Sequence, residues 1–440
     1  MGRDRYVDFV RAWAIVLVVL GHWVITGLVL GPGGEIDAPE LLAVEPWTRW
    51  LTLGFQIMPL FFLAGGHAAG GSWVRARAAG GTAAGWVGRR GLRLLLPAAV
   101  YSGLVLSAVG VCSVVGVDPG TLALVGWAMA MQFWFLPVYL LLGVLTPPLH
   151  AAHRRWGLRV PVVMGAVALV VGWWGMGGQA PYVGAVNYVL VWGVAYQLGF
   201  CWYDGLLTGR RPVAVAVALM VGGGLVFAAL ITFGPFPVSL IRVTGQTPSN
   251  TDPPSAAMLA WVVAQVGLCL LAAPAVRRLL ARERVWRAVR RVGGASMTLY
   301  LWHMLPVLVV AAVFYLPGIA PDPVFGSGAW WALRVPWLLV LGVVLVGVLV
   351  VLRPLERWQA RLYERTRPRF DLRRAWPLWL GLPAGVAAFA YFATRGFAPD
   401  GRVPVPAALA LVLGTILVMT TRLAGREEPD DAKGALRETV

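Results

Sequence analysis

The sequence predicts an all-α membrane protein, a polytopic bundle of about twelve transmembrane helices. Only 13% of the 440 residues are charged, whereas soluble globular proteins carry roughly 25%. Hydrophobic residues make up 59% of the chain, and they gather in runs of about 20 residues, long enough to cross a bilayer. Charge, proline and glycine clusters bound these runs, so each run predicts one span.

The first apolar run lies close behind Arg3 and Arg5, as it would in a signal peptide. It extends to about Leu30, however, and no small-residue cleavage pattern closes it, so we expect a retained span. Together with the later runs, we expect helices at about 10–30, 51–71, 94–116, 122–146, 160–176, 183–203, 212–233, 256–276, 296–317, 330–352, 376–394 and 404–421.

The distribution of basic residues predicts the orientation in the membrane. With the N-terminus inside, 31 of the 37 Lys and Arg residues fall in inner loops and tails, as the positive-inside rule requires. An even number of spans follows, with both termini cytoplasmic. Because these charges flank apolar runs, the net charge of +17 indicates topology and no nucleic-acid partner.

Residue usage predicts a source and a location. Lys433 is the only lysine, and Ala, Gly, Val and Arg are abundant, a bias typical of a GC-rich bacterial genome. We therefore expect a multi-pass protein of the cell membrane, surrounded by the lipid bilayer. Cys112, Cys201 and Cys269 lie singly in apolar stretches, and their spacing predicts neither a metal site nor a disulfide.

The first span carries two ionisable residues, which are costly at bilayer depth and often mark a pathway or reaction site. In "VDFVRAWAIVLVVLGHW" (7–23), Arg11 and His22 are eleven positions apart. They share a helix face about 16 Å apart along the axis, which suits one elongated ligand. Alternatively, Arg11 extends to the interface and pairs with Asp8. His22 has no aqueous interface within reach.

Basic residues also precede the third span, in "GRRGLRLLLP" (88–97). Arg90 and Arg93 are three positions apart, so both guanidinium groups lie on one helix face, as a phosphate site requires. Topology alone also predicts arginines at this inner boundary.

Three more residues are candidates for a pocket: His67 in "MPLFFLAGGHAAGG" (58–71), Trp134 in "MQFWFLPVYL" (131–140), and His303 in "SMTLYLWHMLP" (296–306). For each of them, packing or a core hydrogen bond is the alternative. The remaining histidines, His150 and His153, are expected in a solvated inner loop.

Several of these motifs together resemble the acyltransferase 3 family of integral membrane O-acyltransferases. The similarity extends over about residues 5–352. It is carried, in the order of the family, by "VDFVRAWAIVLVVLGH", "MPLFFLAGG", "RRGLRLLLP", "WFLPVYLL" and "LYLWHMLP".

The resemblance implies an enzyme that transfers an acyl group other than aminoacyl. Family members move the group, often acetyl, from cytoplasmic acyl-CoA to a hydroxyl of a sugar, polysaccharide or other acceptor. By this resemblance, Arg11, Arg90 and Arg93 bind the donor and His22 is the catalytic base. Acetyl-CoA is then a substrate, and we expect no bound cofactor and no metal.

The same comparison predicts the domain organisation. Residues 1–352 form the acyltransferase membrane domain of about ten helices, and 353–375 form a basic cytoplasmic loop. Residues 376–421 add two helices, and 422–440 form a disordered tail. The alternative class is a polytopic transporter or flippase, but the sequence shows no internal repeat of the kind such proteins often contain.

Overall fold

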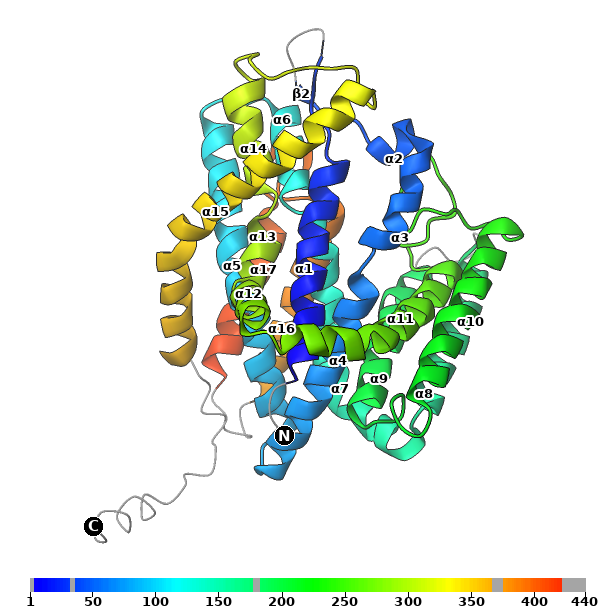
Figure 1. Cartoon of the computed structure of the whole chain (residues 1–440). Coiled ribbons are helices and arrows are strands. Elements are labelled where there is room, and N and C mark those ends of the chain that lie inside the picture. The colour runs from blue at the N-terminus through cyan, green and yellow to red at the C-terminus, as the bar shows by residue number, and fades with distance from the viewer. Residues whose placement is uncertain (1–3, 32–35, 177–182, 366–374, 422–440) are drawn as a thin grey trace. The chain divides into compact units, whose positions relative to one another are not determined.

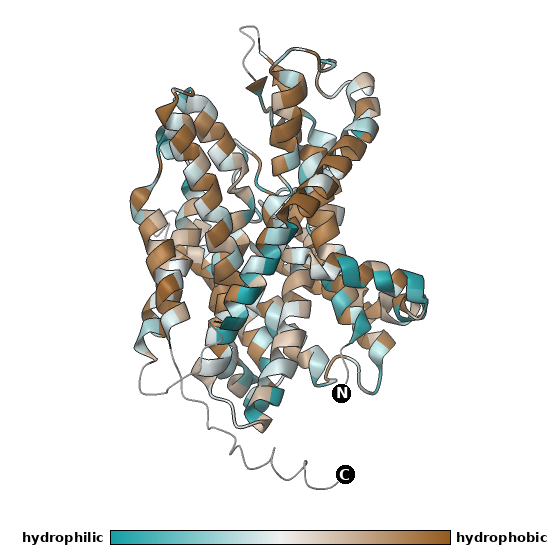
Figure 2. Ribbon diagram, turned by 90° about the vertical axis from the view of Figure 1, so that its left-hand side faces the viewer, coloured by the Kyte–Doolittle hydropathy of each residue, from teal (hydrophilic) through white to brown (hydrophobic). Residues whose placement is uncertain are grey.

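The computed structural model describes residues 4–31, 36–176, 183–365 and 375–421. Helices dominate this part of the chain, and its two short strands, β1 (Val29–Leu30) and β2 (Ile36–Asp37), pair antiparallel. Ten of the described helices are long and apolar enough to cross a membrane, and a bent pair adds an eleventh. The predicted all-α membrane bundle is confirmed. Figure 2 shows hydrophobic residues over much of the long helices.

The chain divides into two compact units. One contains the described residues of Met1–Ser72 and Leu145–Arg353, and the other those of Trp73–Val144 and Pro354–Val440. The division therefore falls inside three long helices, α4 (Met58–Ala78), α7 (Phe135–Trp156) and α15 (Gly328–Arg365).

The first unit contains most of the predicted spans and the site described below. Its remaining elements, in chain order, are α1 (Arg5–Ile25), α2 (Leu41–Val44), η1 (Pro46–Leu51), α3 (Thr52–Phe55), α8 (Arg159–Met176), η3 (Val183–Ala185), α9 (Val186–Tyr203), α10 (Pro212–Thr232), α11 (Ala256–Leu280), α12 (Glu283–Gly294), α13 (Ser296–Trp302), α14 (Leu305–Val310) and η4 (Ala311–Tyr315). Helices α10 and α11 lie side by side (Figure 1).

The second unit joins the third predicted span to the two C-terminal helices. Its elements, besides the ends of the three shared helices, are α5 (Ala83–Val114), α6 (Pro119–Ala128), η2 (Met131–Trp134), α16 (Trp376–Arg395), η6 (Pro399–Gly401) and α17 (Val405–Thr420). A Cβ atom added to Gly414 of α17 would lie 2.7 Å from the Gly381 carbonyl oxygen of α16, so these backbones are in close contact. Helix α17 also packs against α5.

Helix α1 is fixed at its first turn by polar contacts. The Asp4 carboxylate caps the helix by accepting the Tyr6 N–H at 2.8 Å. The Asp4 carboxylate also pairs with Arg277 of α11 at 2.7 Å, and the buried Tyr6 hydroxyl donates to the Cys269 carbonyl at 2.5 Å. Helix α11 thus sets the height and rotation of α1.

The predicted span at 122–146 is wrong as one continuous helix. Helix α6 ends at Ala128, and the chain passes through η2 before α7 begins. At this break, the Met129 carbonyl accepts hydrogen bonds from two side chains, the Tyr101 hydroxyl at 2.7 Å and the Gln132 amide at 3.0 Å. These donors replace the helical hydrogen bond.

The predicted span at 296–317 is also broken, with a bend of 42° between α13 and α14–η4. Pro306 explains the break, because proline has no N–H and its ring clashes with the carbonyl four residues earlier, that of Trp302. The Val307 N–H then donates to Met304 rather than to His303. The His303 carbonyl is left for another donor.

The predicted loop at 353–375 is partly helical, because α15 continues through Arg365. Its last turns, "ERWQARLYER", consist mainly of good helix formers. Residues 366–374 of that loop and the predicted tail at 422–440 lie outside the described residues.

Helices α4 and α9 cross with their backbones in contact. A Cβ atom added to Gly199 would lie 2.6 Å from the His67 backbone nitrogen, and one added to Gly66 would overlap the Tyr196 carbonyl. Close approach at small residues is a common way for membrane helices to associate.

We therefore expect Gly66→Val to destabilise the protein, since overpacking a well-packed contact costs about 1–3 kcal/mol. The midpoint of thermal unfolding in detergent should fall well below that of the wild type. Gly222→Val is the matched control, because a Cβ atom on Gly222 of α10 meets no atom within 4 Å. Equal losses in both variants would contradict the close crossing.

Candidate active site

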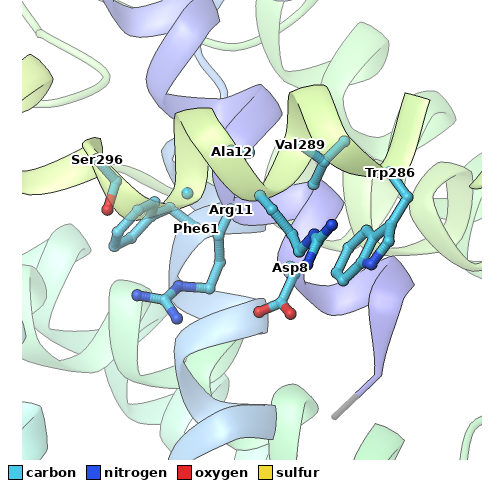
Figure 3. A pocket seen from close by; sticks show the side chains of 9 residues that line it. Asp8, Arg11, Ala12, Phe61, Trp286, Val289 and Ser296 are labelled. Atoms are coloured by element: carbon cyan, nitrogen blue, oxygen red, sulfur yellow. The ribbon is translucent and has the colours of Figure 1, made fainter. Parts of the chain in front are cut away.

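Helix α1 carries Arg11 and His22 into two different surroundings. The helix is unbroken from Arg5 to Ile25, so the two residues are about 16 Å apart along its axis. Arg11 lines a pocket of the first unit with an empty volume of about 360 Å³, including solvent at its mouth (Figure 3). The pocket is lined by Asp8, Arg11, Ala12, Phe61, Trp286, Val289, Arg290, Gly293 and Ser296.

The half-buried Arg11 has hydrogen-bonding capacity left for a ligand. Its guanidinium carbon lies 6.0 Å from the centre of the Phe61 ring, and its Nε is buried without a partner among the described residues. Asp8 places one carboxylate in the same pocket, whereas Arg11 and Arg290 place two guanidinium groups there. The two guanidinium groups are suited to an anionic ligand, although Arg290 also pairs with the Glu283 carboxylate at 3.2 Å.

One wall of the pocket is α12, a helix that lies between the predicted spans at 256–276 and 296–317 and was not predicted. Trp286 and Val289 are buried, while all four arginines of this helix, including Arg290, are exposed. The guanidinium carbons of Arg5 and Arg290 lie 5.1 Å and 5.9 Å from the centre of the Trp286 ring. The signal was available in the sequence, because Trp286 and Val289 are three residues apart within an arginine-rich stretch.

At the other end of α1, His22 contacts a second histidine. Its Nδ1 lies 2.7 Å from Nε2 of His303, and the two rings are stacked with centroids 5.0 Å apart. His303 directly follows α13, at the break of the ninth predicted span. The fold thus joins two residues that the sequence separates by 281 positions.

For two neutral rings, only one arrangement of protons satisfies these contacts. His303 Nδ1 lies 2.8 Å from the Tyr300 carbonyl, which can only accept, so this nitrogen carries the proton. Nε2 of His303 is then an acceptor, and Nδ1–H of His22 donates to it. Nε2 of His22 is left with a free lone pair, as a general base requires.

Exposure distinguishes the two rings. His303 is completely buried, whereas His22 is only half-buried. The Trp23 indole N–H donates to the His303 carbonyl at 2.7 Å. This bond replaces the helical hydrogen bond that the carbonyl loses at the break near Pro306. His22 is therefore the less buried member of the pair, and His303 orients it.

Arg90 and Arg93 belong to the second unit and contact different tyrosines. Nη2 of the half-buried Arg90 lies 3.2 Å from the Tyr139 hydroxyl, and its guanidinium stacks over Trp86. Nε of the exposed Arg93 lies 3.0 Å from the Tyr363 hydroxyl. Their role in donor binding stays a prediction.

The other two candidates, His67 and Trp134, are in aromatic packing. The His67 ring lies 4.7 Å from that of Trp202 and 5.4 Å from that of Tyr203. Trp134 belongs to the second unit, where it packs edge-on against Phe135. A role for either residue in the pocket stays a prediction.

The expectation that His150 and His153 are solvated is wrong. Both lie within α7, with exposures of 7% and 3%. Nε2 of His153 contacts the Asp204 carboxylate at 3.0 Å. Helix α7 simply continues past the apolar run, so its last turns pack against α9 and the residues after it.

A comparison with known families identifies the class to which this helical membrane bundle belongs. A family model described as an acyltransferase domain matches residues 4–353. The chain therefore belongs to the acyltransferase 3 family and is a membrane acyltransferase. The match ends at Arg353, where the first unit also ends. No similar curated protein and no similar solved structure was found.

The proton arrangement at the histidine pair can be measured directly. With five histidines in the chain, selective ¹⁵N labelling should resolve His22 and His303 near neutral pH. We expect both rings to be protonated on Nδ1 and unprotonated on Nε2. Single His→Gln variants assign the signals, and a His22 ring protonated only on Nε2 would contradict the arrangement.

Proposed function

We propose that the protein transfers an acetyl group from cytoplasmic acetyl-CoA to a hydroxyl of a carbohydrate acceptor. The single observation that carries this proposal is the His22–His303 pair, which leaves a lone pair on Nε2 of His22, the less buried residue of the two. The same helix presents Arg11 to a pocket with two guanidinium groups. An elongated donor with phosphates at one end and a thioester at the other matches this spacing.

In the proposed reaction, His22 is the general base. Its Nε2 takes the proton of the acceptor hydroxyl as the oxygen attacks the thioester carbonyl. A C–O bond forms, and the tetrahedral intermediate then breaks its C–S bond. The CoA thiolate leaves and recovers the proton from His22, which yields the ester and free CoA. His303 stabilises the transient imidazolium by accepting the His22 Nδ1–H.

The donor phosphates are proposed to bind beside Arg11. Arginine guanidinium groups match phosphate oxygens in shape and charge, and Arg11 retains an unsatisfied Nε–H. Arg290 adds a second cation to the pocket, and Trp286 adds an aromatic wall. By family similarity, Arg90 and Arg93 of the second unit, which precede the third predicted span, are also proposed to contact the donor.

The proposed setting is the cell membrane, with both termini cytoplasmic. In that orientation, the first turns of α1 and all of α12 lie at the cytoplasmic side, where acyl-CoA is available. The arginines of α12 then follow the positive-inside rule and serve the donor at the same time.

The roles of the two histidines can be tested by turnover of acetyl-CoA in nanodiscs, read as free thiol with a panel of sugars. We expect His22→Ala to reduce kcat by about 10²–10⁴-fold, the contribution of a positioned base. His303→Gln should reduce kcat less. Both variants should keep the wild-type Kd for acetyl-CoA.

Two results would contradict this assignment. If His22→Ala turned over normally, the general base would lie elsewhere. If the wild type neither bound acetyl-CoA nor released thiol with any acceptor, the acetyl-CoA proposal would fail, and assays of transport would come next.

Donor binding provides an independent test of the pocket. Removing the Arg290 guanidinium should raise the Kd for acetyl-CoA about tenfold, since a hydrogen bond involving a charged group contributes roughly 1.5–3 kcal/mol. Arg287→Ala is the matched control, because this arginine of α12 is exposed and does not line the pocket. Equal effects would indicate general attraction to the basic helix.

A further inference from the structure

The C-terminal end of α1 poses a problem that membrane proteins must solve. The last four carbonyl groups of a helix have no intrahelical partner, and within a membrane each unpaired group is costly. In α1 these groups lie directly at His22. The Thr26 backbone N–H and its hydroxyl both donate to the His22 carbonyl, at 3.0 Å and 2.6 Å.

Two further carbonyls, those of Trp23 in the last turn and of the C-cap residue Thr26, receive donors from α15. Nη1 of Arg334 lies 2.8 Å from the Thr26 carbonyl, and the Trp337 indole N–H donates to the Trp23 carbonyl at 3.0 Å. Arg334 and Trp337 are three residues apart, so they share one face of their helix. That face of α15 presents both hydrogen-bond donors to the C-terminal end of α1.

Arg334 is held firmly in this place. It is only 7% exposed, and its guanidinium carbon lies 3.9 Å from the centre of the Trp330 ring and 4.9 Å from that of Trp337. A cation at a helix C-terminus also interacts favourably with the helix dipole. Stacking on two tryptophan rings therefore holds the Arg334 guanidinium, whose charge and hydrogen bond both stabilise the C-terminal end of α1.

The contacts continue from α1 to the second histidine. Trp23, whose carbonyl accepts from Trp337, donates its indole N–H to the His303 carbonyl. Both members of the histidine pair thus depend on the last turn of α1, and that turn depends on α15. The distance between the rings, 2.7 Å from nitrogen to nitrogen, is set through these contacts.

We propose that Arg334 and Trp337 are positioning residues that hold His22 and His303 in their reactive arrangement. This inference rests on the proposed function, because it assigns the two residues to the same reaction. Neither touches the reacting atoms, so their effect is on kcat through the geometry of the base. A misplacement of about 1 Å can cost about 10²-fold in rate.

The test uses Trp337→Phe, which keeps an aromatic ring and removes the N–H, together with Arg334→Gln and Arg334→Lys. We expect Trp337→Phe and Arg334→Gln to lower kcat about tenfold or more and to leave the KM for acetyl-CoA within about twofold. Arg334→Lys should restore part of kcat, since it keeps the cation at the helix end. Val335→Ala is the control, because Val335 is 65% exposed on the same helix.

A second readout does not need turnover. In the ¹⁵N-histidine spectrum, Trp337→Phe and Arg334→Gln should shift His22 from the pure Nδ1–H form to a mixture of tautomers, whereas Val335→Ala should not. If the wild type is active, the proposal requires both the fall in kcat and the tautomer shift in Trp337→Phe and Arg334→Gln. A fall in kcat with an unchanged spectrum, or a tautomer shift with an unchanged kcat, overturns the proposal. If the wild type transfers no acyl group, the proposed function fails and the spectrum alone decides the positioning role.

Discussion

Backbone carbonyls at the end or break of a membrane helix lack a helical N–H donor and need another hydrogen-bond donor. In the first unit, the contacts around the histidine pair meet this requirement. Pro306 breaks one helix and frees the His303 carbonyl, which accepts the Trp23 indole N–H. Helix α1 ends nearby and takes donors from Arg334 and Trp337. The two imidazoles meet where these two helix ends meet.

In the proposed reaction, this arrangement places donor binding and proton transfer at two separate positions along one helix. Arg11 lies in a pocket lined by two guanidinium groups, one carboxylate and the buried tryptophan of α12. His22 lies three turns further on, with its orientation fixed by His303. A rigid helix keeps these two places about 16 Å apart, so a donor bound by its phosphates would present its thioester at a defined distance. Keeping water from that thioester would limit hydrolysis.

Much of this was predictable from local patterns, and the failures have physical causes. Apolar runs predicted most of the spans, and the first-span motif singled out Arg11 and His22. The breaks at Met129 and His303 were missed because an apolar run has the same composition whether or not its helix is continuous. Burial of His153 was missed because its partner, Asp204, lies 51 positions away, directly after α9.

The sequence by itself determined a membrane-embedded acyltransferase with ionisable residues on its first helix, because hydropathy, charge placement and motif order are properties of the chain. Only the tertiary structure decided that His303 is the partner of His22, that α12 forms a wall of the Arg11 pocket, and that α15 holds the end of α1. These contacts join residues up to 314 positions apart. They depend on the directions in which neighbouring helices present their side chains, and no local pattern encodes those directions.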